Sequence, residues 1–205
     1  MATRIQQHLY PIIEIMVAEA VRDIEKDGKK ISCRAGCSHC CYLLVEISWP
    51  EAMELAHWVL KQPKQRRQQL IQRIEDNAAE ARTLFSASKK DVQYCGPVLD
   101  STAEISQKSY DRYFFEKKRP CPLLEDGCCS AYPVRPSTCR MHMVTSPPEL
   151  CSDQVRDEEG YELPDRIDQL REEVGPMNSA VGEGQGWGHL GVMVATALEQ
   201  IQATK

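Results

Sequence analysis

The sequence predicts a mainly α-helical domain that carries irregular cysteine-rich loops. Apolar residues recur at helical spacing in the segments between loops, the cysteines gather in two short clusters, and no clear alternation of apolar and polar residues indicates a sheet. With 205 residues, of which 42% are hydrophobic, the chain can bury a core without disulfide support. We therefore expect one domain over residues 1–205.

The N-terminal segment is predicted to be an amphipathic helix that ends near Gly28. Its apolar stripe has spacings of three and four residues and consists of Ile5, Leu9, Ile12, Ile13, Met16, Ala20 and Ile24. Glu14 and Glu19 interrupt this segment, so it does not have the pattern of a secretory signal, and no apolar run in the sequence is long enough to span a membrane. These features predict a cytoplasmic protein whose thiols stay reduced.

Two further helices are expected in the middle of the chain. Residues 43–47 are short and apolar and predict a brief extended segment. Ser48 can then cap a helix in which Pro50 occupies the first turn and Glu51 completes a capping box. The third helix is expected from about Lys64 to Phe85, with an inward face formed by Leu70, Ile74, Ala78, Ala81 and Phe85.

The C-terminal half is predicted to contain more loops. Residues 101–104 form another possible capping box before a helix near Tyr113, and a short helix is expected from Pro164 to Arg171. Residues 182–205 read as a glycine-rich loop followed by a final helix. The segment from 121 to 142 is rich in proline, which excludes a regular helix or a central strand there.

The cysteines of the two clusters are predicted to form one metal-binding region. The first cluster, in residues 33–41, contains Cys33, Cys37, Cys40 and Cys41, and the second, in residues 121–142, contains Cys121, Cys129 and Cys139. Short spacers let a loop turn its sulfurs toward a common centre. In a reducing compartment this density of thiols favours a metal over disulfides. We therefore expect the two segments to fold together.

The same residues resemble the YkgJ-type cysteine-cluster family, which has a zinc- or iron-chelating domain. The resemblance rests on the four cysteines of the first cluster and on three later motifs. These motifs are Cys121-Pro122-Leu123-Leu124, Cys129-Ser130-Ala131-Tyr132 and Arg135-Pro136 followed by Cys139-Arg140. A flagellin lysine methylase, a larger protein, carries a similar cysteine motif. The resemblance implies that the seven matched cysteines bind metal, and it leaves the roles of Cys95, Cys128 and Cys151 open.

The number of thiols favours an iron–sulfur cluster, most simply a [4Fe–4S] cluster, over a single zinc ion. Zinc takes four ligands, whereas seven cysteines match the family pattern. With four thiolates, a zinc ion and an oxidised [4Fe–4S] cluster have similar formal charges, so charge does not distinguish the two centres. The first hypothesis is an iron–sulfur protein with redox or cluster-dependent modification chemistry, and the sequence leaves open whether it is an enzyme. A zinc-stapled, non-catalytic adaptor and a metal-delivery protein are the alternatives.

Three arginines near the cysteines are candidates for donating hydrogen bonds to the sulfurs, namely Arg34, Arg135 and Arg140. His39 and His142 lie in the same segments, but we expect them to be loop histidines rather than ligands. The net charge of −5 argues against nucleic acid as a partner, and no membrane segment is expected. The substrate and any protein partner cannot be read from the sequence.

Overall fold

The structure is a computed structural model that describes residues 5–34, 36–85, 107–117, 119–151, 160–181 and 186–204. Cys95, the capping box predicted at residues 101–104, and Gly182 and Gly184 of the glycine-rich loop lie outside the described residues. The predicted mainly α class is confirmed. Helices dominate the described part of the chain, and the strands in it are two or three residues long.

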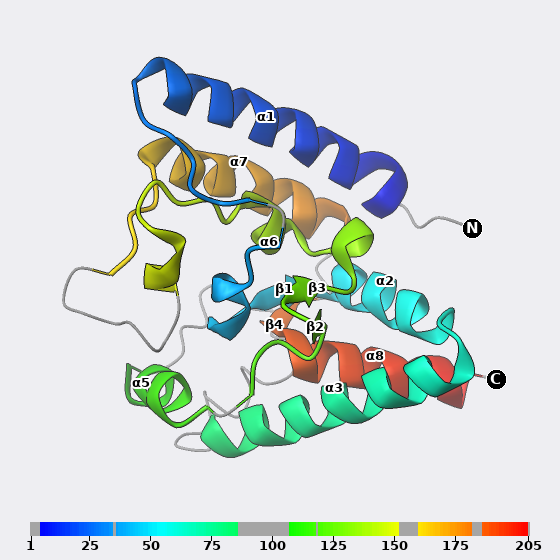
Figure 1. The fold of residues 1–205 in the computed structure, drawn as a ribbon. Coiled ribbons are helices and arrows are strands. Elements are labelled where there is room, and N and C mark those ends of the chain that lie inside the picture. Colours follow the sequence, from blue (N-terminus) through cyan, green and yellow to red (C-terminus); the bar gives the residue numbers. More distant parts are fainter. Residues whose placement is uncertain are drawn as a thin grey trace.

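The helices form two layers, with the cysteine segments between them (Figure 1). One layer pairs α1, Tyr10–Lys26, with α7, Asp165–Val181, and α1 is preceded by a π-helical turn, Ile5–Leu9. The other layer contains α2, Trp49–Leu60, α3, Lys64–Leu84, and α8, Leu190–Ala203. A further helix, α5, spans Gln107–Glu116 and contacts α3. Within the described residues, no helix combines the length and the apolar character needed to cross a membrane.

The α1–α7 layer has its own hydrophobic cluster. Ile13, Ala20 and Ile24 of α1 pack with residues of α7 that include Ile167 and Leu170. The prediction of this helix is confirmed, and Gly28, with φ +78°, follows its C-cap as a left-handed residue that ends it. The predicted stripe was wrong at Ile12, which is 46% exposed, because the face that packs on α7 is narrower than the apolar stripe of the sequence.

The α2–α3–α8 layer holds the larger hydrophobic cluster. The predicted inward residues of α3, namely Leu70, Ile74, Ala78, Ala81 and Phe85, are all buried in it. They pack with Leu55 and Val59 of α2 and with Val194 and Leu198 of α8. The third predicted helix is thus confirmed in both extent and orientation. Its packing gives the cysteine segments a stable support.

Gly191 allows α8 to lie close to α3. A Cβ at this position would lie 2.1 Å from Oδ1 of Asn77 and 3.3 Å from Cε1 of His189, and both of these side chains are buried. We expect Gly191→Ala to lower the free energy of unfolding by about 1–3 kcal/mol, as overpacking does. Urea denaturation tests this. The control is Gly175→Ala in α7, whose Cβ would meet no atom within 4 Å.

Two small antiparallel ladders connect the layers to the loops. Strand β1, Glu46–Ser48, pairs with β4, Trp187–His189, so that Ile47 lies opposite Gly188, and this pairing joins the starts of α2 and α8. Strands β2, Leu124–Glu125, and β3, Cys128–Cys129, form a hairpin in the second cysteine segment. Asp126 and Gly127, with φ of 49° and 74°, make its turn, because a two-residue hairpin turn of this type needs positive φ at both positions.

Two helices differ from the sequence prediction. Residues 121–142 were expected to exclude a regular helix, yet α6, Ser137–Met141, forms one turn directly after Pro136. Proline is tolerated at a helix start, where its missing N–H has no intrahelical partner. Helix α7 continues ten residues beyond the predicted end at Arg171, through Gly175 and Pro176, because its apolar residues pack on α1.

Candidate metal centre

The two cysteine segments meet between the helical layers. The backbone N–H of Cys121 donates to the carbonyl oxygen of Cys41 at 2.7 Å, which joins the segments directly. On the other side of the first cluster, the Ser32 N–H donates to the Val144 carbonyl at 2.9 Å, and the Ser32 hydroxyl donates to the Thr145 carbonyl at 3.0 Å. Residues about 80 and 110 positions apart in sequence are therefore held side by side (Figure 1).

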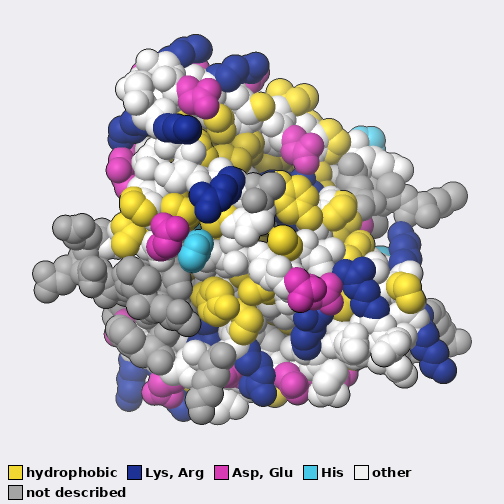
Figure 2. Space-filling view, viewed as in Figure 1, with side chains coloured by type: hydrophobic (Ala, Val, Ile, Leu, Met, Phe, Trp, Pro, Cys, Tyr) yellow, Lys and Arg dark blue, Asp and Glu magenta, His cyan; other side chains and the backbone are white. Residues whose placement is uncertain are grey.

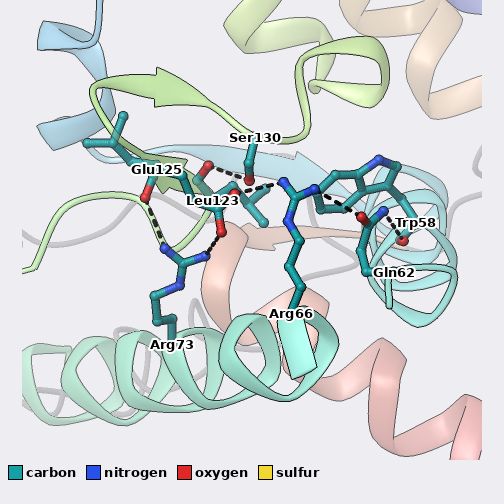
Figure 3. A network of polar contacts seen from close by, with 8 residues as sticks. Trp58, Gln62, Arg66, Arg73, Leu123, Glu125 and Ser130 are labelled. Atoms are coloured by element: carbon teal, nitrogen blue, oxygen red, sulfur yellow. Dashed lines mark hydrogen bonds and ion pairs between the residues drawn. The ribbon is translucent and has the colours of Figure 1, made fainter. Parts of the chain in front are cut away.

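Helix α3 anchors the β2–β3 hairpin that carries Cys129. Figure 3 shows Arg66 and Arg73 reaching from α3 to Glu125 of the hairpin. Their Nη2 atoms lie 2.7 and 2.5 Å from the Glu125 carboxylate oxygens, and Arg73 also donates to the Leu124 carbonyl. Burial opposes ionisation of Glu125, but the two arginines outweigh it and lower the pKa of Glu125. The hairpin thus has a fixed position on a rigid helix.

Glu51 anchors α6, the helical turn that carries Cys139. One of its carboxyl oxygens accepts hydrogen bonds from the Ser137 N–H at 2.7 Å and hydroxyl at 2.5 Å. The other accepts from the Ser48 N–H and hydroxyl, both at 3.0 Å, which includes the predicted capping box of α2. Asn178 of α7 closes the network, with its amide on the Ser137 hydroxyl. The starts of α2 and α6 are thereby fixed to one buried carboxyl group, and the C-terminal end of α7 joins them through Ser137.

The nine cysteines that the structure describes are all free thiols. Burial raises the pKa of Cys121 to about 12 and the pKa of Cys139 well above its usual range. Cys40 and Cys41 share a hydrogen bond that lowers the pKa of Cys40 to about 7 and raises the pKa of Cys41. Because a metal ligand must be a thiolate, binding at these sites would release protons.

The thiols fall into two groups that meet at Cys40. Besides burial, nearby thiols raise the pKa values of Cys41, Cys121 and Cys139. These nearby thiols belong to the same three cysteines and to Cys40 and Cys129. Cys33 has Cys37 and Cys40 as its neighbouring thiols. All seven predicted cysteines thus lie in one region. Among the described residues, however, no three His, Cys, Asp or Glu side chains are grouped tightly enough to hold a metal ion in their present positions.

Comparison with known protein families connects this region to metal binding. Residues 32–163 match the family model CxxCxxCC, described as "Putative zinc- or iron-chelating domain". The match covers well over half of the 205 residues. The chain belongs to the CxxCxxCC family. No curated protein and no solved structure matches it.

The CxxCxxCC match confirms the family resemblance found in the sequence, and its span contains both cysteine segments. This protein is therefore a cysteine-ligated metal-binding protein. Its donor set consists of soft thiols, which suit zinc and iron–sulfur clusters alike, so the donors fit either kind of centre.

Arg135 is the predicted arginine that faces the thiols of this CxxCxxCC domain. Its charge lowers the pKa values of Cys33, Cys40 and Cys129, although burial dominates for Cys33 and Cys129 and the Cys41 hydrogen bond dominates for Cys40. Within the described part of the chain, its Nε is buried without a hydrogen-bond partner. A buried N–H beside several sulfurs fits a centre whose thiolates accept hydrogen bonds.

The other two predicted arginines have different surroundings. Arg140 is 4% exposed and donates to the carbonyls of Arg135 and Pro133, both at 2.8 Å. It also pairs with Glu14 of α1 and lies over the Tyr10 ring, so it fixes the loop between Cys129 and Cys139. Arg34 is exposed. Their predicted donation to sulfur stays a prediction.

The sequence left the roles of Cys128 and Cys151 open, and it predicted His142 to be a loop histidine rather than a ligand. Cys128 is exposed, whereas Cys151 is buried. His142 is held by the Arg171 guanidinium at 3.1 Å, and burial together with this charge lowers the pKa of His142 to about 4. The ring is therefore neutral near pH 7. No spacing rule in the sequence points to Cys151, because it lies twelve residues after Cys139 and beyond two prolines.

A cavity of about 400 Å³ opens beside the thiols. Cys40 and Cys139 lie in its wall together with Leu43, Val174, Tyr161 and Arg171. The volume and the mixture of apolar and polar lining are typical of sites for small molecules. Two of the cysteines in the family pattern therefore line a space of small-molecule size.

Among the described side chains on the face shown in Figure 2, no large patch of one charge indicates a charged partner. On the face shown in Figure 2, Lys and Arg side chains are interspersed with Asp and Glu side chains. Nucleic-acid sites usually need a basic stripe or patch. The expectation that nucleic acid is not a partner stays a prediction.

Proposed function

We propose that this protein binds an iron–sulfur cluster through its cysteine thiolates and uses it in redox or cluster-dependent modification of a small molecule. The observation that carries the proposal is the cavity of about 400 Å³ with Cys40 and Cys139 in its wall. A structural zinc site is closed around four ligands, whereas a reacting centre keeps an open side. The cavity supplies that open side.

The donor set supports the same proposal. The ligands in this proposal are Cys33, Cys37, Cys40, Cys41, Cys121, Cys129 and Cys139, which exceed the four that one zinc ion takes. Bound thiolates bring negative charge into a half-buried site. Arg135, with its orphaned Nε, would donate to a sulfur and offset part of that charge. The cluster would supply electrons or an open iron site, while the cavity residues bind and orient the substrate.

A zinc-stapled adaptor is the second candidate, and one observation favours it. The cysteine segments lie between two helical layers whose hydrophobic clusters are separate, so a metal there would hold the layers together. In that case chelation would release much of the fold, as it does in small zinc domains.

Metal and sulfide analysis of protein purified without oxygen separates the two candidates. The iron–sulfur proposal expects a brown protein that contains iron and acid-labile sulfide and absorbs broadly near about 400 nm. A colourless protein with stoichiometric zinc and no labile sulfide would reject it. Circular dichroism before and after chelation then shows whether the metal also supports the fold.

Serine substitutions test the assignment of the ligands. We expect Cys37→Ser and Cys129→Ser each to reduce bound metal several-fold, because a hydroxyl is a poor substitute for a soft thiolate ligand. Cys95→Ser, outside the family pattern, should keep the metal content of the unmodified protein. Iron, zinc and sulfide per chain are the measurements. An equal loss in all three variants would show that the ligands are wrongly assigned.

A further inference from the structure

Cys151 lies against the first cysteine cluster, although it is distant in sequence. It ends a 3₁₀ turn, Pro148–Cys151, that packs on the turn His39–Tyr42, which contains Cys40 and Cys41. Cys151 is 3% exposed, yet it belongs to neither hydrophobic cluster. Burial, together with the neighbouring thiols of Cys40, Cys33 and Cys37, raises the pKa of Cys151 to about 12. Its neighbours thus include the thiols of the first cluster and the ring of His142.

The ring of His142 is oriented so that it can donate to the Cys151 sulfur. Nη2 of Arg171 lies 3.1 Å from Nδ1 of His142, and a guanidinium can only donate. Nδ1 therefore accepts, and in the neutral ring the proton is on Nε2. Nε2 lies 3.7 Å from the Cys151 sulfur. Arg171 thus sets the tautomer that directs an N–H toward this thiol.

Cys33 receives a similar donor from the same stretch of chain. The backbone N–H of Val144 lies 3.4 Å from the Cys33 sulfur. Residues 142–144 therefore direct one N–H to Cys33 and another to Cys151. Hydrogen bonds of this kind orient metal-bound thiolates and tune the metal. A cysteine buried only for packing would need no such donor.

We propose that Cys151 is a metal ligand that completes, with Cys33, Cys37 and Cys40, a four-thiolate site beside a second one formed by Cys41, Cys121, Cys129 and Cys139. The thiol neighbours described above divide in this way, with Cys40 at the junction. Four thiolates suit one iron–sulfur cluster or one zinc ion. The proposal rests on the proposed function, because it assigns ligands to the same metal region. His142 acts in it as a positioning residue.

The first test compares Cys151→Ser with Cys128→Ser, an exposed cysteine of the same region that serves as the matched control. After anaerobic purification, Cys151→Ser should retain about half of the metal of the unmodified protein, and Cys128→Ser should retain all of it. Full retention or complete loss of metal in a folded Cys151→Ser variant would overturn the two-site assignment. An unmodified protein without iron or zinc would instead refute the proposed function itself.

The second test does not require removal of a ligand. His142→Leu deletes the donor to the Cys151 sulfur, whereas the side-chain amide of His142→Gln can still donate. Hydrogen bonds to sulfur raise the reduction potential of an iron–sulfur cluster, so His142→Leu should shift one of two potentials to a more negative value. His142→Gln should restore part of that shift, with metal content unchanged in both. Identical potentials in all three proteins would contradict the role given to Cys151 and His142.

Discussion

Replacing Glu51 with alanine is expected to lower the free energy of unfolding by about 2–6 kcal/mol, because it removes the acceptor that two buried backbone N–H groups share. Glu51 is 1% exposed, and its carboxyl group accepts hydrogen bonds from two backbone N–H groups and two hydroxyls. Alanine leaves the N–H groups of Ser48 and Ser137 without their partner. Each buried donor left in this way costs about 1–3 kcal/mol.

The same substitution should also reduce the metal content. Ser137 is the first residue of α6, and Cys139 lies two positions later in this single turn. If Glu51 no longer holds Ser137, the turn loses its attachment to the start of α2, and Cys139 loses a fixed position beside Cys121 and Cys129. The stability of the helical layer and the integrity of the metal region are therefore coupled through one carboxyl group.

Urea denaturation and metal analysis test both expectations. Glu51→Gln should give an intermediate loss, because the amide keeps one acceptor oxygen but presents an N–H₂ group to the donors of one serine. Glu75→Ala, on the exposed face of α3, is the control and should change the free energy of unfolding by less than about 0.5 kcal/mol. If Glu51→Ala were as stable as Glu75→Ala, the network would not support the fold.

The helices could be predicted from the sequence to the extent that their packing follows local periodicity. Helix α3 was predicted almost to its last residue, because its buried face repeats every three to four positions. Helix α7 was predicted too short, since Gly175 and Pro176 are local signals to stop and only the contact with α1 overrides them. Ile12 shows the opposite error, because the helical period is correct but includes a residue that is exposed.

The cysteines of the candidate site could be predicted from the sequence, but the residues that hold them in place could not. Spacing and the family resemblance together indicated which cysteines bind metal, and the structure places these cysteines in one region. The second role of Glu51 could not be predicted, because its contact with Ser137 joins residues 86 positions apart. Cys151 and the donor that His142 directs to it depend likewise on the loop around residue 150 folding back onto residues 39–42. Local patterns carry no information on such contacts.

Acidification is expected to destabilise the fold through His189, in addition to any effect on the metal. His189 is 2% exposed, with its Nε2 at 3.0 Å from the Tyr113 hydroxyl. Burial, and then the charge of Lys117, lower the pKa of His189 to about 3, whereas the unfolded side chain titrates near about 6.5. Between these values the unfolded chain binds a proton that the folded chain does not. The neutral ring therefore contributes its full stability above about pH 6.5.

This contribution decreases as the pH falls from about 6.5 toward 3, at a rate of about 1.4 kcal/mol per pH unit for one proton. The measurement is the slope of the free energy of unfolding against pH between 5 and 6.5, from urea denaturation. His189→Gln should reduce the slope by the contribution of this one titrating group. His8→Gln, at an exposed position, should leave the slope unchanged. Bound metal is quantified at each pH, because thiolate ligands also compete with protons. Equal slopes in all three proteins, at equal metal content, would mean that the buried ring does not stay neutral. In that case His189 would not be a neutral ring buried beside Tyr113 and Phe85.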